Sequence, residues 1–341
     1  MLMQAHATTT GHSGAAIAHP VLEVRNLRVV FPTRHGVLNA VSDVSLTINK
    51  GEILGLVGES GAGKSMTGMA TLGLLEPPGR IAEGEILLDG RRIDNLPERE
   101  MAKIRGRRIG AIFQDPLTSL HPLFTVGAQL VETIRLHLHL SRSQARRRAI
   151  DLLKEVGIPA ASDRIDDYPH QFSGGMRQRV VIALALAAEP ELIIADEPTT
   201  ALDVSIQAQI TALLRRICRE RAAAVMLVTH DMGVIAETAD RVAVLYAGRI
   251  VEVGHVDAVI HAPKHPYAKG LMDSIPPLEG RVARLAQIDG SMPRPDSIPE
   301  GCAFHSRCTL AGPHCRIAVP GLVETEGSRT ACWLYSGGVE A

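Results

Sequence analysis

The stretch Gly55–Ser65, GLVGESGAGKS, limits the possible folds of this chain more than any other feature. It fits the pattern G-x-x-x-x-G-K-[ST], with Gly58, Gly63, Lys64 and Ser65 at the fixed places. An apolar run precedes it, and the helix-like run MTGMATLGLL follows it. A strand, a glycine loop and a helix in this order predict an α/β protein built on a mostly parallel sheet.

The chemistry of such a loop requires these residue types. Glycines let backbone N–H groups curl around a phosphate, and the start of the helix adds partial positive charge. Lys64 is expected to reach the β- and γ-phosphates, and Ser65 to ligate Mg²⁺. The predicted nucleotide contacts are Gly58, Glu59, Ser60, Gly61, Ala62, Gly63, Lys64, Ser65 and Met66. A glycine-rich loop without a ligand is the alternative, and the strand–loop–helix context argues against it.

A second apolar run, LIIADEP (Leu192–Pro198), ends in two adjacent acids. Asp196 is placed to hold Mg²⁺ through water, and Glu197 to orient an attacking water or accept its proton. Adjacent strand residues point to opposite sides, so the two acids can divide these roles. An Asp-Glu pair alone is more often a solvated turn, but the phosphate loop favours the functional interpretation.

Apolar strands alternate with helical stretches through most of the chain. Strand patterns begin at about Val21, Gly84, Gly110, Glu191 and Ala224. Helical patterns cover Arg142–Val156 and about 205–221. This order predicts a parallel sheet covered on both faces. After Ala262 prolines accumulate and the apolar periodicity fades. Residues 263–341 are therefore predicted to form an irregular extension that needs a stabilising crosslink.

Composition narrows the function classes. A net charge of −1 and an aromatic content of 3% argue against nucleic-acid partners. Residues 1–20 lack the pattern of a signal peptide and are expected to form a flexible tail. The longest apolar run is about half the roughly 20 residues that a membrane span needs. We therefore expect a cytoplasmic protein, in which clustered cysteines indicate metal or redox chemistry rather than disulfides.

The text QFSGGMRQR distinguishes this chain from other phosphate-loop proteins. Ser173, Gly174 and Gly175 open a helix and could form a second anion site. The segment Phe172–Arg179 resembles the signature motif of ATP-binding-cassette (ABC) ATPases, with Phe172 where leucine is commoner. That resemblance implies contact with the γ-phosphate of ATP held by another subunit, and hence a head-to-tail dimer with two ATP molecules at its interface.

Four further positions resemble ABC elements in the expected order. Gln114 resembles the Q-loop glutamine that senses Mg²⁺, and Asp203 the D-loop aspartate. His230 resembles the switch histidine that contacts the γ-phosphate, and Phe31 stands where the family has an aromatic that stacks on adenine. The resemblance covers 21–262 and implies a RecA-like core, an antiparallel β-subdomain and a helical subdomain at about 114–180.

The stretches QDPLTSLHPLFTVGAQL and HPYAKGLMDSIP resemble the ATP-binding subunits of dipeptide and oligopeptide importers, a group that includes nickel importers. His121, where asparagine is expected, is a departure. The resemblance implies a peripheral ATPase on the cytoplasmic face of the membrane. Its partners would be a second ATPase subunit, two permeases and, indirectly, an extracytoplasmic solute-binding protein. A motor for nickel or another small solute stays open, as does a soluble ABC ATPase, which the single cassette disfavours.

The extension carries four of the five cysteines, Cys302, Cys308, Cys315 and Cys332. Their wide C-x5-C-x6-C-x16-C spacing lacks the tight pairs that are usual for structural zinc. Iron–sulfur ligation by four cysteines tolerates wider spacing. The cysteine set resembles one that holds a [4Fe–4S] cluster in the peptide-importer group, so the resemblance implies such a cluster as the crosslink. Zinc, or no metal, remain alternatives.

Overall fold

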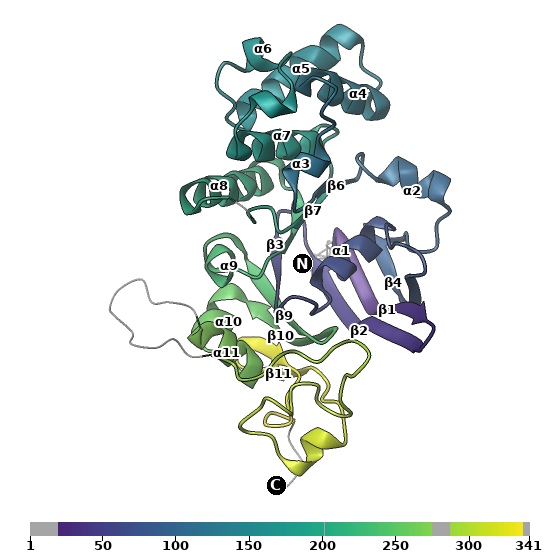
Figure 1. The fold of residues 1–341 in the computed structure, drawn as a ribbon, viewed down its shortest axis with the longest axis vertical. Coiled ribbons are helices and arrows are strands. Elements are labelled where there is room, and N and C mark those ends of the chain that lie inside the picture. The colour runs from purple at the N-terminus through teal and green to yellow at the C-terminus, as the bar shows by residue number, and fades with distance from the viewer. Residues whose placement is uncertain (1–19, 201, 275–286, 337–341) are drawn as a thin grey trace, which may run out of the picture.

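The computed structural model describes residues 20–200, 202–274 and 287–336. Figure 1 shows a helical subdomain at one end of the long axis and the C-terminal extension at the other. The antiparallel β-subdomain lies beside the middle of the molecule. The predicted tail of residues 1–20 falls outside the described residues except for Pro20.

The elements alternate much as the sequence predicts. The strands are β1 (Leu22–Thr33), β2 (Gly36–Ile48), β3 (Ile53–Val57), β4 (Arg80–Leu88), β5 (Arg91–Arg92), β6 (Ile109–Ile112), β7 (Leu192–Asp196), β8 (Ala224–Val228), β9 (Arg241–Tyr246), β10 (Arg249–His255), β11 (Val323–Thr325) and β12 (Ser328–Thr330). The helices are α1 (Lys64–Leu72), α2 (Glu98–Ile104), α3 (Pro116–Ser119), α4 (Val126–Leu138), α5 (Arg142–Glu155), α6 (Ala161–Arg164), α7 (Gly174–Leu186), α8 (Val204–Arg221), α9 (Met232–Thr238), α10 (Val256–His261) and α11 (Pro266–Asp273), with 3₁₀ turns at Pro169–Gln171 and Pro313–Arg316.

The main sheet has the order β11-β12-β10-β9-β3-β8-β7-β6. Its central strands β9, β3, β8, β7 and β6 pair in parallel, as predicted. Every residue of β3 and β8 is buried, because both faces of these strands are covered. The carboxyl ends of these parallel strands point to one edge, where α/β proteins place their ligands.

Two cores lie on opposite faces of this sheet. Leu54 and Leu56 pack into the core that β1, β2, β4 and α1 complete. Ile53 and Val57 pack into the other core, beneath α7, α8 and α9. The alternation follows from the period of two along a strand, so one five-residue strand joins the β-subdomain to the helical layer.

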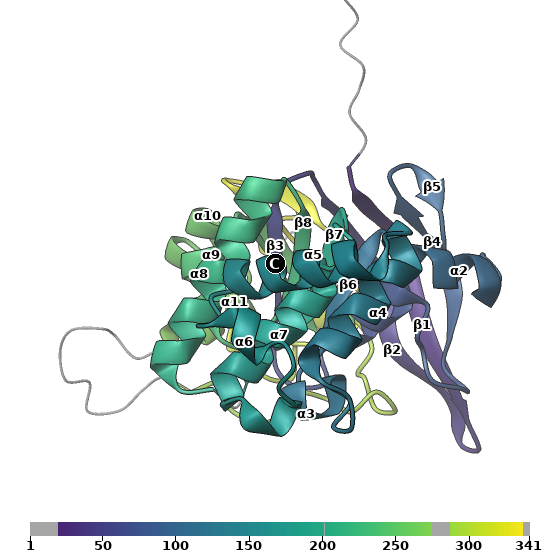
Figure 2. The same cartoon turned by 90° about the horizontal axis from the view of Figure 1, so that it is seen from above.

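The helical subdomain is formed by α3 to α7 (Figures 1 and 2). Its α5 is the amphipathic helix that the sequence predicts, and it begins at a capping box formed by Ser141 and Gln144. Ala145, Ala149, Leu152 and Leu153 form its buried face. Between 20–200, 202–274 and 287–336, no helix has the length and apolarity to cross a membrane.

The C-terminal extension is more ordered than the sequence predicts. Its β12 pairs antiparallel with β10, so the hairpin β11–β12 continues the main sheet. The buried carboxylate of Glu252 on β10 accepts hydrogen bonds from the N–H groups of Lys264 and His265 and from the hydroxyl of Ser328. Three-residue strands are too short for a periodic pattern, which is why the sequence did not predict this hairpin.

Candidate nucleotide site

The phosphate loop lies between the carboxyl end of β3 and the start of α1. Gly58 has a φ of 147°, and a Cβ there would lie 2.2 Å from the carbonyl oxygen of Leu245. Only glycine fits this position. The Nζ of Lys64 donates to the carbonyl oxygens of Gly58 at 2.8 Å and Glu59 at 3.0 Å. The lysine therefore lies over its own loop, where phosphate oxygens bind.

Ser65 and Asp196, the predicted magnesium ligands, lie next to each other. The Ser65 hydroxyl donates to Oδ1 of Asp196 at 2.9 Å, across 131 residues of sequence. Burial raises the pKa of Asp196, and the Ser65 hydrogen bond opposes that rise. Burial also lowers the pKa of Lys64, against the attraction of Glu197, Asp196 and Glu59. A hydroxyl and a carboxylate side by side match the oxygen ligands that Mg²⁺ takes in phosphate-loop enzymes.

Glu197 is at the centre of the polar contacts of the site. Its Oε2 accepts hydrogen bonds from Thr200 at 2.8 Å and from Gln114 at 3.1 Å. Nδ1 of His230 lies 3.1 Å from its Oε1. Burial acts to raise the pKa of Glu197, but the hydrogen bonds with His230 and Thr200 outweigh it and lower the pKa.

This arrangement keeps Glu197 ionised and fixed in direction, as a residue that accepts a proton from water must be. The residue follows β7 directly, at a φ of 47°. Asp196 points back to Ser65, whereas Glu197 turns toward His230 and Gln114. The two acids therefore face different groups, but Glu197 lies just after β7 at a positive φ, so this turn of the backbone directs it rather than the alternation of strand side chains.

A cavity of about 710 Å³ joins these groups. It is lined by Ala40, Ser60, Gly61, Ala62, Gly63, Lys64, Ser65, Met66, Gln114, Glu197, Thr200, His230 and Pro295. Ten of these residues are predicted site residues. Sequence reasoning missed Ala40, Thr200 and Pro295. Thr200 could have been noticed because it lies three residues after Glu197, but nothing near Pro295 in the sequence indicates a nucleotide contact.

Other predicted residues lie outside this cavity. Phe31 lies on β1, and a Cβ added to Gly79 would lie 2.5 Å from its ring. Phe31 does not line the nucleotide cavity, so its contact with adenine stays a prediction. Ser173 caps α7, and a Cβ on Gly174 would meet no atom within 4 Å. Asp203 caps α8 by accepting from the N–H of Ile206. Ser173, Gly174, Gly175 and Asp203 thus do not line the cavity that contains the phosphate loop of their own chain.

The four cysteines of the extension come together. Cys302, Cys308, Cys315 and Cys332 all line one largely apolar cavity of about 460 Å³, and all four are free thiols. Burial raises the pKa of the Cys302, Cys308 and Cys332 thiols. Within the described parts of the chain, no group of three or more His, Cys, Asp or Glu side chains has the arrangement to hold a metal ion.

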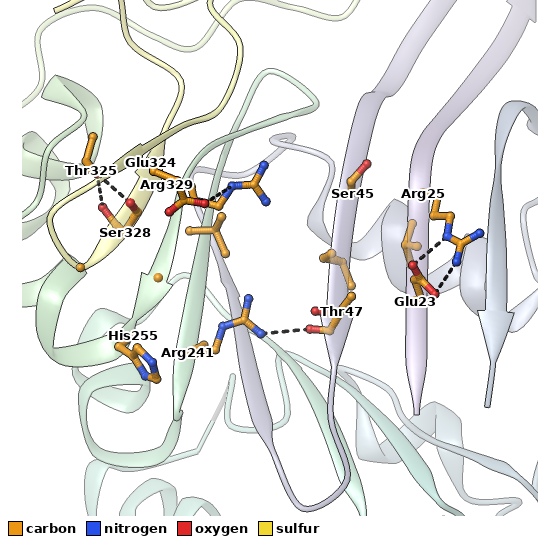
Figure 3. A pocket seen from close by; sticks show the side chains of 15 residues that line it. Glu23, Arg25, Ser45, Thr47, Arg241, His255, Glu324, Thr325, Ser328 and Arg329 are labelled. Carbon is orange, nitrogen blue, oxygen red and sulfur yellow. Dashed lines mark hydrogen bonds and ion pairs between the residues drawn. The ribbon is translucent and has the colours of Figure 1, made fainter. Parts of the chain in front are cut away.

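A further cleft of about 490 Å³ lies between β1 and β2 and the hairpin β11–β12 (Figure 3). Its charged side chains are engaged locally: Arg25 with Glu23, Arg329 with Glu324, and Arg241 with the Thr47 carbonyl. It contains none of the predicted site residues. The nucleotide cavity is therefore where the predicted catalytic groups meet.

Known proteins share both halves of this chain. Residues 41–200 match the ABC transporter family, and residues 251–315 match the C-terminal region of oligopeptide/dipeptide transporters. Oligopeptide transport ATP-binding protein OppD of Haemophilus influenzae is 46% identical over 316 residues, which are 93% of this chain and 98% of that protein. The chain belongs to the ABC transporter ATPases.

Two other comparisons agree with this assignment. Dipeptide transport ATP-binding protein DppD of Bacillus subtilis is 48% identical over 316 residues, covering 92% of this chain and 94% of that protein. The dimeric post-hydrolysis structure of the ATP-binding cassette MJ0796 with ADP and Pi superposes with a TM-score of 0.62 and 30% identity, over 69% of this chain and 98% of that one. The predicted ABC fold and the predicted ATPase activity are confirmed.

Proposed function

We propose that this ABC ATPase is the motor subunit of a membrane importer for dipeptides or oligopeptides. The observation that carries the proposal is the near full-length similarity to OppD and DppD, whose names give oligopeptide and dipeptide transport. The extension adds support, because residues 251–315 match the C-terminal region of that transporter group. The ATPase is peripheral, on the cytoplasmic face of the membrane.

Two copies, or one copy and a related subunit, close head to tail around ATP in this proposal. Lys64 and Glu197 act in one half-site, and Ser173 to Gly175 of the other subunit contact the γ-phosphate. The open space at the helix start supports this, because a Cβ added to Gly174 would meet no atom of the described residues within 4 Å beyond its immediate neighbours. Ser65 and Asp196 would hold Mg²⁺, which would neutralise charge on the β- and γ-phosphates. Glu197 accepts the proton of the attacking water, and hydrolysis reopens the dimer.

The membrane partners are two permease subunits, which receive the cargo from an extracytoplasmic binding protein. Their docking surface is the segment after Gln114, where Leu117, Leu123 and Phe124 are exposed by 63%, 77% and 53%. Exposed apolar side chains gathered on one segment are typical of a protein interface. Gln114 connects this segment to Glu197 through its 3.1 Å hydrogen bond, which couples docking to catalysis.

The four cysteines hold a [4Fe–4S] cluster in this proposal. Four thiols around one apolar cavity supply the donor set that such a cluster takes. Cys302, Cys308, Cys315 and Cys332 would each supply one thiolate to the cluster. The bound cluster would supply a structural crosslink between turns that lack a large core.

The cargo is tested by uptake in a strain deleted for this gene. Expression of the wild-type chain is expected to restore uptake of radiolabelled di- or tripeptides, and Glu197→Gln is the matched inactive variant. Restored uptake of nickel without peptide uptake would contradict the peptide assignment. Neighbouring genes for two permeases and a binding protein would support it.

The cluster is tested by anaerobic purification. The protein is expected to contain iron and sulfide and to absorb broadly near about 400 nm, as cysteine-ligated clusters do. Replacement of Cys302 and Cys308 by serine should remove both signals. A colourless, iron-free wild-type protein would contradict the cluster, and zinc in its place would support the alternative.

A further inference from the structure

One buried arginine of the C-terminal extension contacts the phosphate loop. Nη1 of Arg307 donates to both carboxylate oxygens of Glu59, at 2.9 and 3.2 Å. Glu59 is the second residue of GESGAGKS. The Arg307 side chain is 7% exposed, and a guanidinium buried to this extent needs a charged partner. The two residues are 248 positions apart in sequence, so only the fold brings them together.

The guanidinium has a fixed direction. Its Nε donates to the Asp289 carbonyl at 2.9 Å, and Nη1 also lies 3.4 Å from the Tyr246 hydroxyl. The rings of Tyr246 and Phe304 lie 5.8 and 5.9 Å from its central carbon. Arg307 therefore loses little further freedom when it binds Glu59, and a preordered donor of this kind holds its acceptor firmly.

The backbone of Glu59 is held as well. Its N–H donates to the hydroxyl of Tyr267 at 2.9 Å, and Tyr267 is fully buried on α11 of the extension. Its carbonyl accepts from Nζ of Lys64 at 3.0 Å. Glu59 thus connects two residues of the extension to the lysine that reaches the phosphates.

The extension also covers the loop. We call residues 287–298 the strap. Within it, the methyl carbon of Met292 lies 3.2 Å from where a Cβ on Gly61 would be, and Pro295 lines the nucleotide cavity. The carbonyls of Ile288, Asp289 and Gly290 in the strap face Arg307. The same arginine therefore organises the strap and the loop beneath it.

We propose that Arg307 is a positioning residue of the ATPase site. It fixes the phosphate loop, through Glu59, in the conformation that binds the phosphates of a nucleotide. The backbone N–H groups of such a loop contact phosphates present in both ATP and ADP. Loss of the contact that holds the loop should therefore weaken the binding of ATP and of ADP by the same factor and leave the rate of the chemical step unchanged. The C-terminal extension is in this sense part of the nucleotide site.

The test is Arg307→Ala in the full-length chain. Titration with fluorescent ATP and ADP analogues should give dissociation constants that are each raised about tenfold, the effect of losing one charge-assisted contact. The KM for ATP should rise to the same extent, and kcat should stay within about twofold. Arg307→Lys should give an intermediate loss, because it keeps the charge but loses the planar guanidinium whose Nε and Nη2 are held by the strap carbonyls. A purely structural role would instead lower the active fraction, and so kcat, at unchanged KM.

Glu59→Gln provides a second test if Arg307→Ala does not fold. It should weaken the binding of ATP and of ADP to a similar extent. The double variant should bind nucleotide no more weakly than either single variant, since the two residues act through one contact. The matched control is Arg329→Ala, which removes an extension arginine paired with Glu324 at 3.3 Å. The control should bind nucleotide like the wild type. Nucleotide affinity within about twofold of wild type in Glu59→Gln or Arg307→Ala, or a lower kcat at unchanged KM, would overturn the proposal.

Discussion

At the scale of single residues, the most specific prediction concerns the effect of replacing Glu197 on ATP hydrolysis. Glu197→Gln removes the proton acceptor but keeps the shape and the hydrogen bonds to Gln114 and Thr200. We expect kcat to fall by about 10²–10⁴, the usual contribution of general-base catalysis, with ATP affinity unchanged. Single-turnover hydrolysis measures the rate and equilibrium titration measures the affinity. Full-rate hydrolysis would remove Glu197 from this role.

Replacing Lys64 should lower the affinity for ATP, whereas replacing Glu197 should lower kcat. Lys64→Ala removes the buried cation that lies over the loop carbonyls of Gly58 and Glu59. ATP affinity is expected to fall about 100-fold or more, because a charge-assisted phosphate contact is lost in a partly desolvated site. Titration with a fluorescent ATP analogue measures this loss. Undiminished affinity would contradict the assignment of the phosphate loop.

His265 should make stability depend on pH. Burial lowers its pKa to about 3, whereas an exposed histidine titrates near 6.5. Between these values the unfolded chain binds the extra proton, so the contribution to the free energy of unfolding is complete above about pH 6.5 and falls as the pH falls. The expected loss is about 2 kcal/mol between pH 7 and pH 5.

His265→Asn keeps a side-chain acceptor for the N–H of Tyr267 but cannot titrate. Urea unfolding of the two proteins at pH 5, 6 and 7 separates the effects. The variant should show a flatter dependence of the unfolding free energy on pH, even if it is less stable at pH 7. Parallel pH profiles would show that another group is responsible.

At the scale of elements, the hairpin β11–β12 and the start of α11 depend on Glu252. Its carboxylate is fully buried and accepts from Ser328 and from the N–H groups of Lys264 and His265. Glu252→Ala leaves these donors without their acceptor and should cost about 3 kcal/mol or more. Chemical denaturation measures the change.

The control for this prediction is Glu324→Ala on β11. Glu324 is 82% exposed and pairs with Arg329, so its removal should change stability by less than about 0.5 kcal/mol. Equal losses in both variants would mean that Glu252 does not anchor the extension. This comparison also asks whether the extension unfolds together with the main sheet that it continues.

At the scale of the whole molecule, ATP should assemble the Glu197→Gln variant into a stable dimer. Size-exclusion chromatography with light scattering is expected to give twice the 36.6 kDa chain mass with ATP, and the monomer without it. Adding Gly174→Asp should abolish the dimer by placing a negative charge against the γ-phosphate of the other subunit. The monomer fold and ATP binding should stay intact, because a Cβ on Gly174 has free space around it. A dimer that persists in this variant would contradict the head-to-tail arrangement.

The sequence by itself determined the phosphate loop, the acids Asp196 and Glu197, and the class of fold. These features are local: strand, loop and helix are adjacent in the chain, and their residue types follow from phosphate and magnesium chemistry. The buried strands and α5 could likewise be predicted, because apolar periodicity is a property of short windows.

Only the tertiary structure decided how distant segments meet. The hairpin β11–β12 joins the main sheet through pairs such as Glu252↔Thr330, and Arg307 reaches Glu59 across 248 residues. Thr200 and Pro295 enter the nucleotide cavity, and four widely spaced cysteines surround one cavity. Such contacts depend on chain direction and packing over the whole molecule, and no short window of sequence records them. The extension thus proves to be a part of the ATPase sheet that also covers its phosphate loop.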